Sequence, residues 1–271
     1  MIELKERKDI AYHRGTSRDT YREFDLYFQS SSTLPLIIFV HGGAWRSEDK
    51  LDHSALARSL VSVTGLPVIV PNYRLSAQNN DIHHPIHAQD ILECLLFVSS
   101  VPHDLPQVFD PSRIYLIGHS CGAHMLASIL LDSSSISPAL TPPPVILNAI
   151  RGVVFSEGIY DIDRLLVDFP GYRSWFIAAA FGDRPSYAAF NTAQLPLRSS
   201  GSTTQWLIIH SKGDTLVNLP QSEAMLAHLK SLYGDQLVEG NIELIEEHDA
   251  ILSTRNYLRI VSDFINAGRE K

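Results

Sequence analysis

The sequence predicts an α/β protein built on one mostly parallel, doubly wound sheet. Short apolar strands alternate with amphipathic helices along the 271 residues, and no internal repeat or linker interrupts them. Residues 114–117 are apolar, which is typical of a buried parallel strand, and apolar residues recur at helical spacing after Cys121. We therefore expect a single domain over residues 1–271, with Ser120 at a strand-to-helix corner.

Strands are predicted where four or five largely apolar residues run together. The first belongs to an edge strand or hairpin within residues 1–34, and the others are expected to be buried. The predicted strands are residues 24–28, 36–40, 67–70, 114–117, 152–155, 206–209 and 242–245.

Helices are predicted where apolar residues recur every three or four positions. In the first of them Leu51, Ala55, Leu56, Leu60 and Val63 fall on one face. The Ser- and Pro-rich stretch 133–144 is predicted to be a loop. The predicted helices are residues 49–63, 85–100, the stretch after Cys121, 220–232 and 250–265.

Residues 158–203 interrupt this alternation. Eight aromatic residues lie between Gly158 and Gly201, a density consistent with a small helical cap over a pocket. Most of these rings are expected to form the core of the cap itself. Tyr160 and Trp175 are the candidates for rings that contact a substrate.

The charge and composition of the chain exclude some classes of binding partner and indicate its compartment. The net charge is −8 and no basic patch stands out, which argues against nucleic acid and anionic membranes as partners. The first ten residues lack the apolar core of a secretory signal, and no apolar stretch is long enough to span a bilayer. Cys94 and Cys121 both fall in predicted helices, where a disulfide is not favoured. We expect a reduced, cytoplasmic protein, and a homodimer is compatible with the sequence, which leaves the oligomeric state open.

Glycines flank Ser120 at the predicted corner. Gly118 and Gly122 stand two residues before and after it, in the pattern G-x-S-x-G. A sharp strand-to-helix turn brings backbones too close for side chains at these two positions and holds the serine outward, as in a nucleophile elbow. Ser120 is therefore the predicted nucleophile. Cys121 is not, because its position directs its backbone N–H rather than its thiol at the reacting centre.

A serine nucleophile requires a histidine base and an acid that orients the histidine. In proteins with a nucleophile elbow, the order along the chain is serine, acid, histidine. His248 follows the last predicted strand, whereas His228 lies inside an amphipathic helix, so His248 is the predicted base. Asp214 follows a strand and is the predicted acid. Glu157 closes the preceding strand and remains the alternative.

Two weaker carboxylates complete the candidates for the acid. Asp161 lies further from its strand end, and Asp249 adjoins His248 too closely to hold its ring. We expect Asp249 to be the N-cap of the last helix instead.

Adjacent glycines also end the strand at residues 36–40. His41-Gly42-Gly43-Ala44-Trp45 follows it, and the free backbone N–H groups of such a turn suit an oxyanion hole. The predicted donors are the N–H groups of Gly43 and Cys121, with Gly42 or Ala44 as a further donor.

The histidine cluster at residues 83–87 is the one metal-like pattern. His83 and His87 have the spacing of a shared helix face, but Pro85 marks the helix start and leaves His83 outside the regular turn. We therefore predict no metal site, and the expected chemistry requires no cofactor.

With these residues in place, the chain resembles the α/β-hydrolase superfamily, and within it the kynurenine formamidase (arylformamidase) branch. The resemblance covers about residues 35–260 and rests on His41-Gly42-Gly43-Ala44-Trp45 and on Gly118-His119-Ser120-Cys121-Gly122-Ala123. Gly158-Ile159-Tyr160-Asp161 and residues 210–217 also look like that branch. Cys121 departs from the small or aliphatic residue expected there, a change that we expect to affect pocket shape.

The resemblance implies hydrolysis of N-formyl-L-kynurenine to L-kynurenine and formate, a cytosolic step of tryptophan degradation towards NAD synthesis. A formyl group requires a tight acyl pocket, for which Trp45 would supply a wall, unless it only packs under the following helix. A carboxylesterase acting on short acyl esters has the same machinery and is the alternative function. A non-catalytic binding protein would lack members of the triad.

Overall fold

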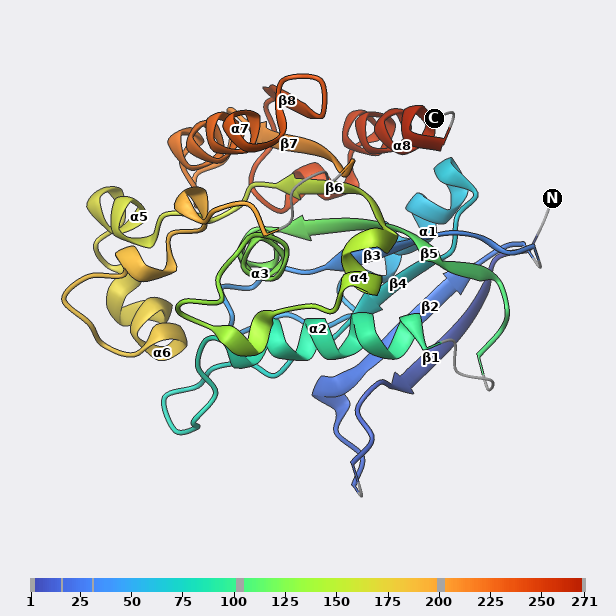
Figure 1. The fold of residues 1–271 in the computed structure, drawn as a ribbon, viewed down its shortest axis with the longest axis horizontal. Helices are drawn as coiled ribbons and strands as arrows, with labels where there is room; N and C mark the ends of the chain where they lie inside the picture. Colours follow the sequence, from blue (N-terminus) through green and yellow to red (C-terminus); the bar gives the residue numbers. More distant parts are fainter. Residues whose placement is uncertain (1–2, 16, 31, 101–104, 199–202, 270–271) are drawn as a thin grey trace.

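The computed structural model describes residues 3–15, 17–30, 32–100, 105–198 and 203–269, and within them the strands form one sheet of eight (Figure 1). They are β1 (Lys5–Ala11), β2 (Glu23–Phe28), β3 (Leu34–Val40), β4 (Val68–Pro71), β5 (Phe109–His119), β6 (Ile150–Ser156), β7 (Gln205–Ser211) and β8 (Val238–Leu244). Their order across the sheet is β1-β2-β4-β3-β5-β6-β7-β8. The β1–β2 and β2–β4 pairs are antiparallel and all other neighbours are parallel, so the predicted mostly parallel sheet is confirmed.

Helices cover both faces of this sheet. Along β3, Leu36, Ile38 and Val40 pack into one hydrophobic cluster, whereas Ile37 and Phe39 pack into the other. The first cluster includes the buried faces of α2, α3 and α7, and the second those of α1 and α8, as expected for a doubly wound sheet. These helices are α1 (Ser54–Thr64), α2 (Ile86–Ser99), α3 (Cys121–Leu130), α7 (Leu219–Tyr233) and α8 (Arg255–Arg269).

The first helix begins later than predicted. Residues 49–53 form turns in which the side chains of Asp49 and Asp52 accept hydrogen bonds from backbone N–H groups, an arrangement that competes with the helix. Of the five residues predicted to share the buried face of α1, Leu56 and Leu60 are buried, whereas Leu51, Ala55 and Val63 are exposed; Ala57 and Val61 are buried in their place.

Other boundaries also differ from the sequence prediction: β5 and β8 begin earlier than the predicted strands 114–117 and 242–245. The short helix α4 (Pro144–Ala149) follows the proline-rich stretch and has too few turns to give a periodic signal. The last predicted helix is divided into a 3₁₀ turn (Ala250–Ser253) and α8, because Thr254 is extended and its hydroxyl accepts the N–H of Tyr257.

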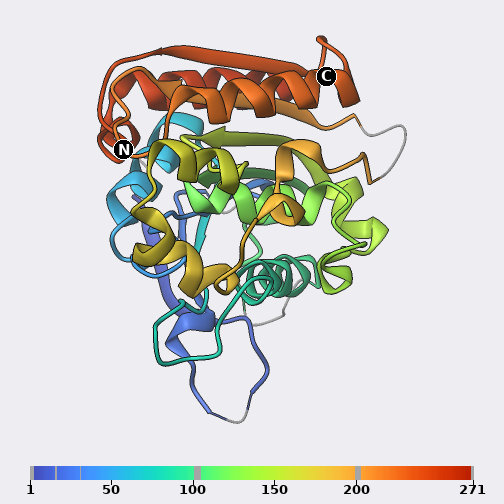
Figure 2. The same cartoon turned by 90° about the vertical axis from the view of Figure 1, so that its left-hand side faces the viewer.

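Short helices between β6 and β7 form the predicted cap. These are α5 (Ile162–Asp168), the π-helical turn η3 (Arg173–Ile177) and α6 (Ala178–Phe181), followed by two 3₁₀ turns. Figure 1 shows them at one end of the sheet, and Figure 2 turns this end toward the viewer. The end of the predicted cap at residues 199–202 lies outside the described residues.

None of the helices in the described part of the chain combines the length and apolar character needed to cross a membrane.

Candidate active site

Ser120 lies on a sharp turn between β5 and α3. Its backbone has φ = 53° and ψ = −120°, in the left-handed half of conformational space that non-glycine residues rarely adopt. A Cβ atom on Gly122 would lie 2.3 Å from the carbonyl oxygen of Val40, and one on Gly118 would lie 2.8 Å from Ala123. The turn therefore has the geometry of a nucleophile elbow, with glycine required on both sides.

We predict that Gly122→Ala lowers the melting temperature by several degrees. The added methyl group meets the backbone of β3, which is central in the sheet and has no flexible side chain to move aside. The matched control is Gly171→Ala in the cap, where a Cβ meets nothing within 4 Å. Thermal unfolding of both variants measures the difference, and equal melting temperatures would show that the elbow tolerates the methyl group.

His248 and Asp214 form a buried hydrogen-bonded pair beside the elbow. The Nδ1–H of His248 donates to Oδ2 of Asp214 at 2.7 Å, and the side chains are 7% and 0% exposed. The backbone N–H groups of Leu216 and Val217 donate to Oδ1 of the same carboxylate. Asp214 thus orients the imidazole with one oxygen while the backbone fixes the other.

Charge on this carboxylate is stabilised despite its burial. Burial alone would raise the pKa of Asp214, but hydrogen bonds from His248, Glu157 and the Val217 N–H together hold it well below its usual range. Asp214 is therefore ionised at neutral pH, the state that an orienting acid needs.

Glu157, the alternative acid, lies in the same cluster but in the opposite charge state. Its Oε1 accepts the N–H of Ser211 at 2.8 Å, and its Oε2 lies 3.3 Å from Nδ1 of His210. Burial, followed by the hydrogen bond and the charge of Asp214, raises the pKa of Glu157 to about 10. A protonated Glu157 thus adds no second charge beside Asp214, and it lies next to the carboxylate that contacts His248.

We predict that Glu157→Gln becomes more stable relative to the wild type as the pH rises from about 5 to 9. The folded wild type keeps a proton on Glu157 up to about pH 10, whereas the unfolded chain releases it above its ordinary pKa. Wild-type stability therefore falls across this window by up to about 1.4 kcal/mol per pH unit, and the glutamine variant lacks this loss. Denaturant unfolding at several pH values measures the difference, and parallel curves would contradict it.

The loop after β3 is curled so that consecutive side chains take different directions. Gly43, Ala44, Trp45 and Glu48 all have positive φ, and the N–H groups of Arg46 and Ser47 both donate to the carbonyl of Gly43. A Cβ on Gly42 would lie 3.0 Å from Cβ of Ser120, so the loop passes directly over the elbow. Gly42 therefore adjoins Ser120 and Gly43 lines the cleft beside it, so the N–H groups of both remain candidates for oxyanion donors.

The thiol of Cys121 supports this loop from below. Its sulfur accepts the N–H of Trp45 at 3.2 Å and lies 3.7 Å from the hydroxyl of Tyr73, whose shortest hydrogen bond, at 2.5 Å, is to the carbonyl of Gly42. Burial raises the pKa of this thiol to about 12, so it stays protonated. The side chain therefore anchors the loop and does not line the cleft, contrary to the expectation that it affects pocket shape.

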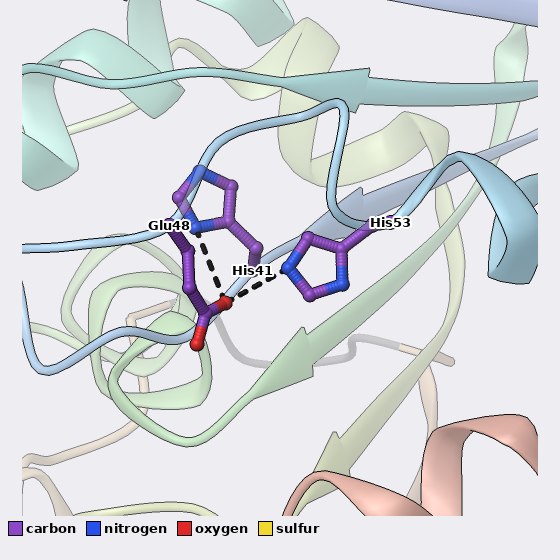
Figure 3. A group of neighbouring side chains, drawn as sticks. All are labelled: His41, Glu48 and His53. Carbon is purple, nitrogen blue, oxygen red and sulfur yellow. Dashed lines mark hydrogen bonds and ion pairs between the residues drawn. The ribbon is translucent and has the colours of Figure 1, made fainter.

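A second support lies at the side of the loop. Figure 3 shows Glu48 with one carboxylate oxygen facing the rings of His41 and His53. His53 Nε2 donates to this oxygen at 2.8 Å, and Nδ1 of His41 lies 3.8 Å away. His41 is fully buried, and burial lowers its pKa to about 3, so its ring is neutral and donates to the carbonyl of Gly42.

Potential metal ligands converge at three places among the described residues. One is the His41, Glu48 and His53 cluster, and the other two both include His248. Because Nδ1 of His41 already faces the carbonyl of Gly42, we assign the first cluster to support of the loop. The histidine cluster considered above as a metal-like pattern has other partners. His83 is hydrogen-bonded to the carbonyl of Ala179, and His87 is hydrogen-bonded to the hydroxyl of Ser76.

A cleft of about 360 Å³ opens above Ser120 and His248. Its aromatic wall consists of Tyr172, Trp175 and Phe176 from the cap, and its charged wall consists of Arg46, Glu48 and Asp249 from two loops. The remaining lining residues are Gly43, Ala44, Ser47, Ile159, Leu216 and Val217.

Of the three rings predicted to contact substrate, only Trp175 lines the cleft. Trp45 is fully buried, and its ring packs on His124, Phe176 and Phe181 in the core. Tyr160 is also fully buried, because its ring folds back over Gly158 and packs on Phe155. Neither ring forms the surface of the cleft; Trp45 supports it from behind through Phe176.

Sequence reasoning missed Arg46, Glu48, Tyr172 and Phe176 as lining residues. It also placed Asp249 as a helix cap, whereas the Asp249 side chain makes no capping hydrogen bond and lines the cleft. The aromatic density of residues 158–203 was the available signal for the cap rings. Arg46 and Glu48 gave no comparable signal, because the directions of their side chains depend on the positive φ angles of the loop after β3.

Comparison with known proteins places the chain among hydrolases. A family model named BD-FAE matches residues 24–141. A kynurenine formamidase of Meyerozyma guilliermondii is 28% identical over 254 residues, which span 92% of this chain and 91% of that protein. A kynurenine formamidase of Scheffersomyces stipitis is 24% identical over 239 residues, spanning 79% and 84% respectively.

A solved structure shares the fold. Esterase B from Lactobacillus rhamnosis aligns with a TM-score of 0.77 at 19% identity, covering 98% of this chain and 87% of that one. The likeness covers nearly the whole chain, and it confirms the predicted α/β-hydrolase fold.

Proposed function

We propose that this chain, which has the α/β-hydrolase fold and is similar to kynurenine formamidases, is a serine hydrolase that cleaves N-formyl-L-kynurenine to L-kynurenine and formate. One observation carries the proposal. The elbow serine shares a cleft that has an aromatic wall with His248, whose ring is hydrogen-bonded to the buried Asp214 behind it. The reaction would be a step of tryptophan degradation towards NAD synthesis.

The proposed mechanism follows from the positions of these groups. The hydroxyl of Ser120 attacks the formyl carbon while His248 accepts its proton, and Asp214 stabilises the resulting imidazolium. The tetrahedral oxyanion accepts hydrogen bonds from the N–H groups of Gly43 and Cys121, with Gly42 adjacent; one such donor contributes about 3 kcal/mol. The C–N bond then breaks as His248 protonates the aryl amine.

Water completes the cycle. It attacks the formyl ester of Ser120 with His248 as base, releases formate and restores the serine hydroxyl. Both halves of the reaction use the same base, so no further catalytic residue is required.

Features of the cleft favour an aryl amine as the leaving group. Trp175 is 52% exposed and is positioned to stack on a substrate ring beside Tyr172 and Phe176. An aryl amine with an ortho carbonyl also departs more readily than an alkyl amine.

The compartment proposed is the cytoplasm. Cys94 and Cys121 are both unpaired and buried, a state that suits a reducing environment.

The test is the kcat/KM of the purified protein on N-formyl-L-kynurenine beside p-nitrophenyl acetate and butyrate. Deformylation well above ester turnover supports the proposal. Ester hydrolysis with little or no deformylation would refute the formamidase assignment and favour a short-chain carboxylesterase.

A further inference from the structure

The charged wall of the cleft carries charges of both signs in one small region. Arg46 and Glu48 come from the loop after β3, and Asp249 follows His248. Glu48 and Asp249 also line a neighbouring hollow of about 550 Å³, so they form the partition between the two spaces. A neutral acyl ester would leave these charges without a partner from the substrate.

The two carboxylates are not neutralised by the protein. Among the described residues, Glu48 pairs only with His53 and His41, and Asp249 lies 3.9 Å from His119, with no lysine or arginine on either. Burial raises the pKa of Asp249; His248 opposes this rise, whereas the charge of Glu48 adds to it, because the two carboxylates repel each other. A cation bound between them would relieve this repulsion.

Arg46 is fixed where the two walls meet. Its Nη1 donates to the backbone carbonyl of Trp175 at 2.6 Å, which ties the loop after β3 to the aromatic wall. This bond uses one of the five N–H donors of the guanidinium, and the others remain for a carboxylate. An anion held there would therefore lie next to a ring stacked on Trp175.

We infer that the cleft recognises an aryl substrate bearing an α-amino acid side chain, with the carboxylate bound by Arg46 and the ammonium by Glu48 and Asp249. The inference rests on the proposed function and names the residues that select its zwitterionic substrate. The aromatic wall holds the ring, and the charged wall holds the chain. Charge pairing at both ends of the amino acid then separates this substrate from neutral aryl formamides and from esters.

The experiment compares N-formyl-L-kynurenine with ortho-acetylformanilide, which has the same ring, formyl group and ketone but no amino acid. In Arg46→Gln, the ratio of kcat/KM between the two should fall about 10- to 100-fold, mainly through KM, as expected for loss of a charge-assisted pair. Arg46→Lys should restore part of the ratio. The matched control is Arg164→Gln, an exposed arginine of the cap that does not line the cleft, which should keep the wild-type ratio.

Binding to Ser120→Ala decides the inference independently of turnover. Calorimetry should show L-kynurenine binding more tightly than ortho-aminoacetophenone, and adding Arg46→Gln should remove most of that difference. Adding Glu48→Gln should instead reduce the preference for L-kynurenine over its analogue without the α-amino group. An unchanged kcat/KM ratio in the Arg46 variants would overturn the inference even if deformylation is fast. If deformylation is absent but the binding preferences change as described, only the proposed function is refuted.

Discussion

Replacement of Ser120 by alanine is expected to reduce kcat on N-formyl-L-kynurenine by about 10⁵- to 10⁶-fold while the fold remains intact. The elbow presents this hydroxyl to the cleft, and its removal leaves only the oxyanion donors and substrate binding to accelerate the reaction. Single-turnover kinetics on the purified variant measures the loss, and thermal unfolding checks that the structure is retained.

The matched control for Ser120→Ala is Ser128→Ala in α3, the helix that follows Ser120. Ser128 is buried, and its hydroxyl donates to the carbonyl of His124 away from the cleft. It should retain most of the activity. Substantial turnover in Ser120→Ala would refute the nucleophile assignment, and a similar loss in both variants would point to damage of α3 instead.

The backbone of the site could be predicted because its requirements are local. Gly118 and Gly122 mark a turn that only small residues permit, and the strand before them is recognisable from a short apolar run. Parallel strands end at one edge of the sheet, so residues that follow strands, such as Asp214 and His248, are brought together there.

Side-chain directions could not be predicted, because they depend on contacts distant in the sequence. The side chain of Trp45 points into the core and that of Arg46 lines the cleft, because the loop that carries them contains residues with positive φ. Contacts with Cys121, Tyr73 and His53 stabilise this loop. Tyr160 folds back because Gly158 leaves room for its ring. The protonation of Glu157 could not be predicted either, because it depends first on the burial of this side chain and then on Asp214 beside it.

Asp214→Asn is expected to lower kcat by about 10⁴-fold, because the amide no longer stabilises the imidazolium and favours the wrong tautomer of His248. Glu157→Gln should cost far less, about 10-fold, because glutamine keeps a donor toward Asp214 and an acceptor for Ser211. The kcat of the two variants on N-formyl-L-kynurenine therefore distinguishes the orienting acid from its support. A larger fall in Glu157→Gln would reverse the assignment.

A double variant separates a catalytic effect of Asp214 from a purely structural one. If Asp214 acts through His248, then Asp214→Asn combined with His248→Ala should be no slower than His248→Ala alone, because the acid has no imidazole left to orient. If the carboxylate only stabilises the loop at residues 214–217, where it accepts two backbone N–H groups, the two losses should multiply. The hydrogen bond of 2.7 Å between these buried side chains leads us to expect the first outcome.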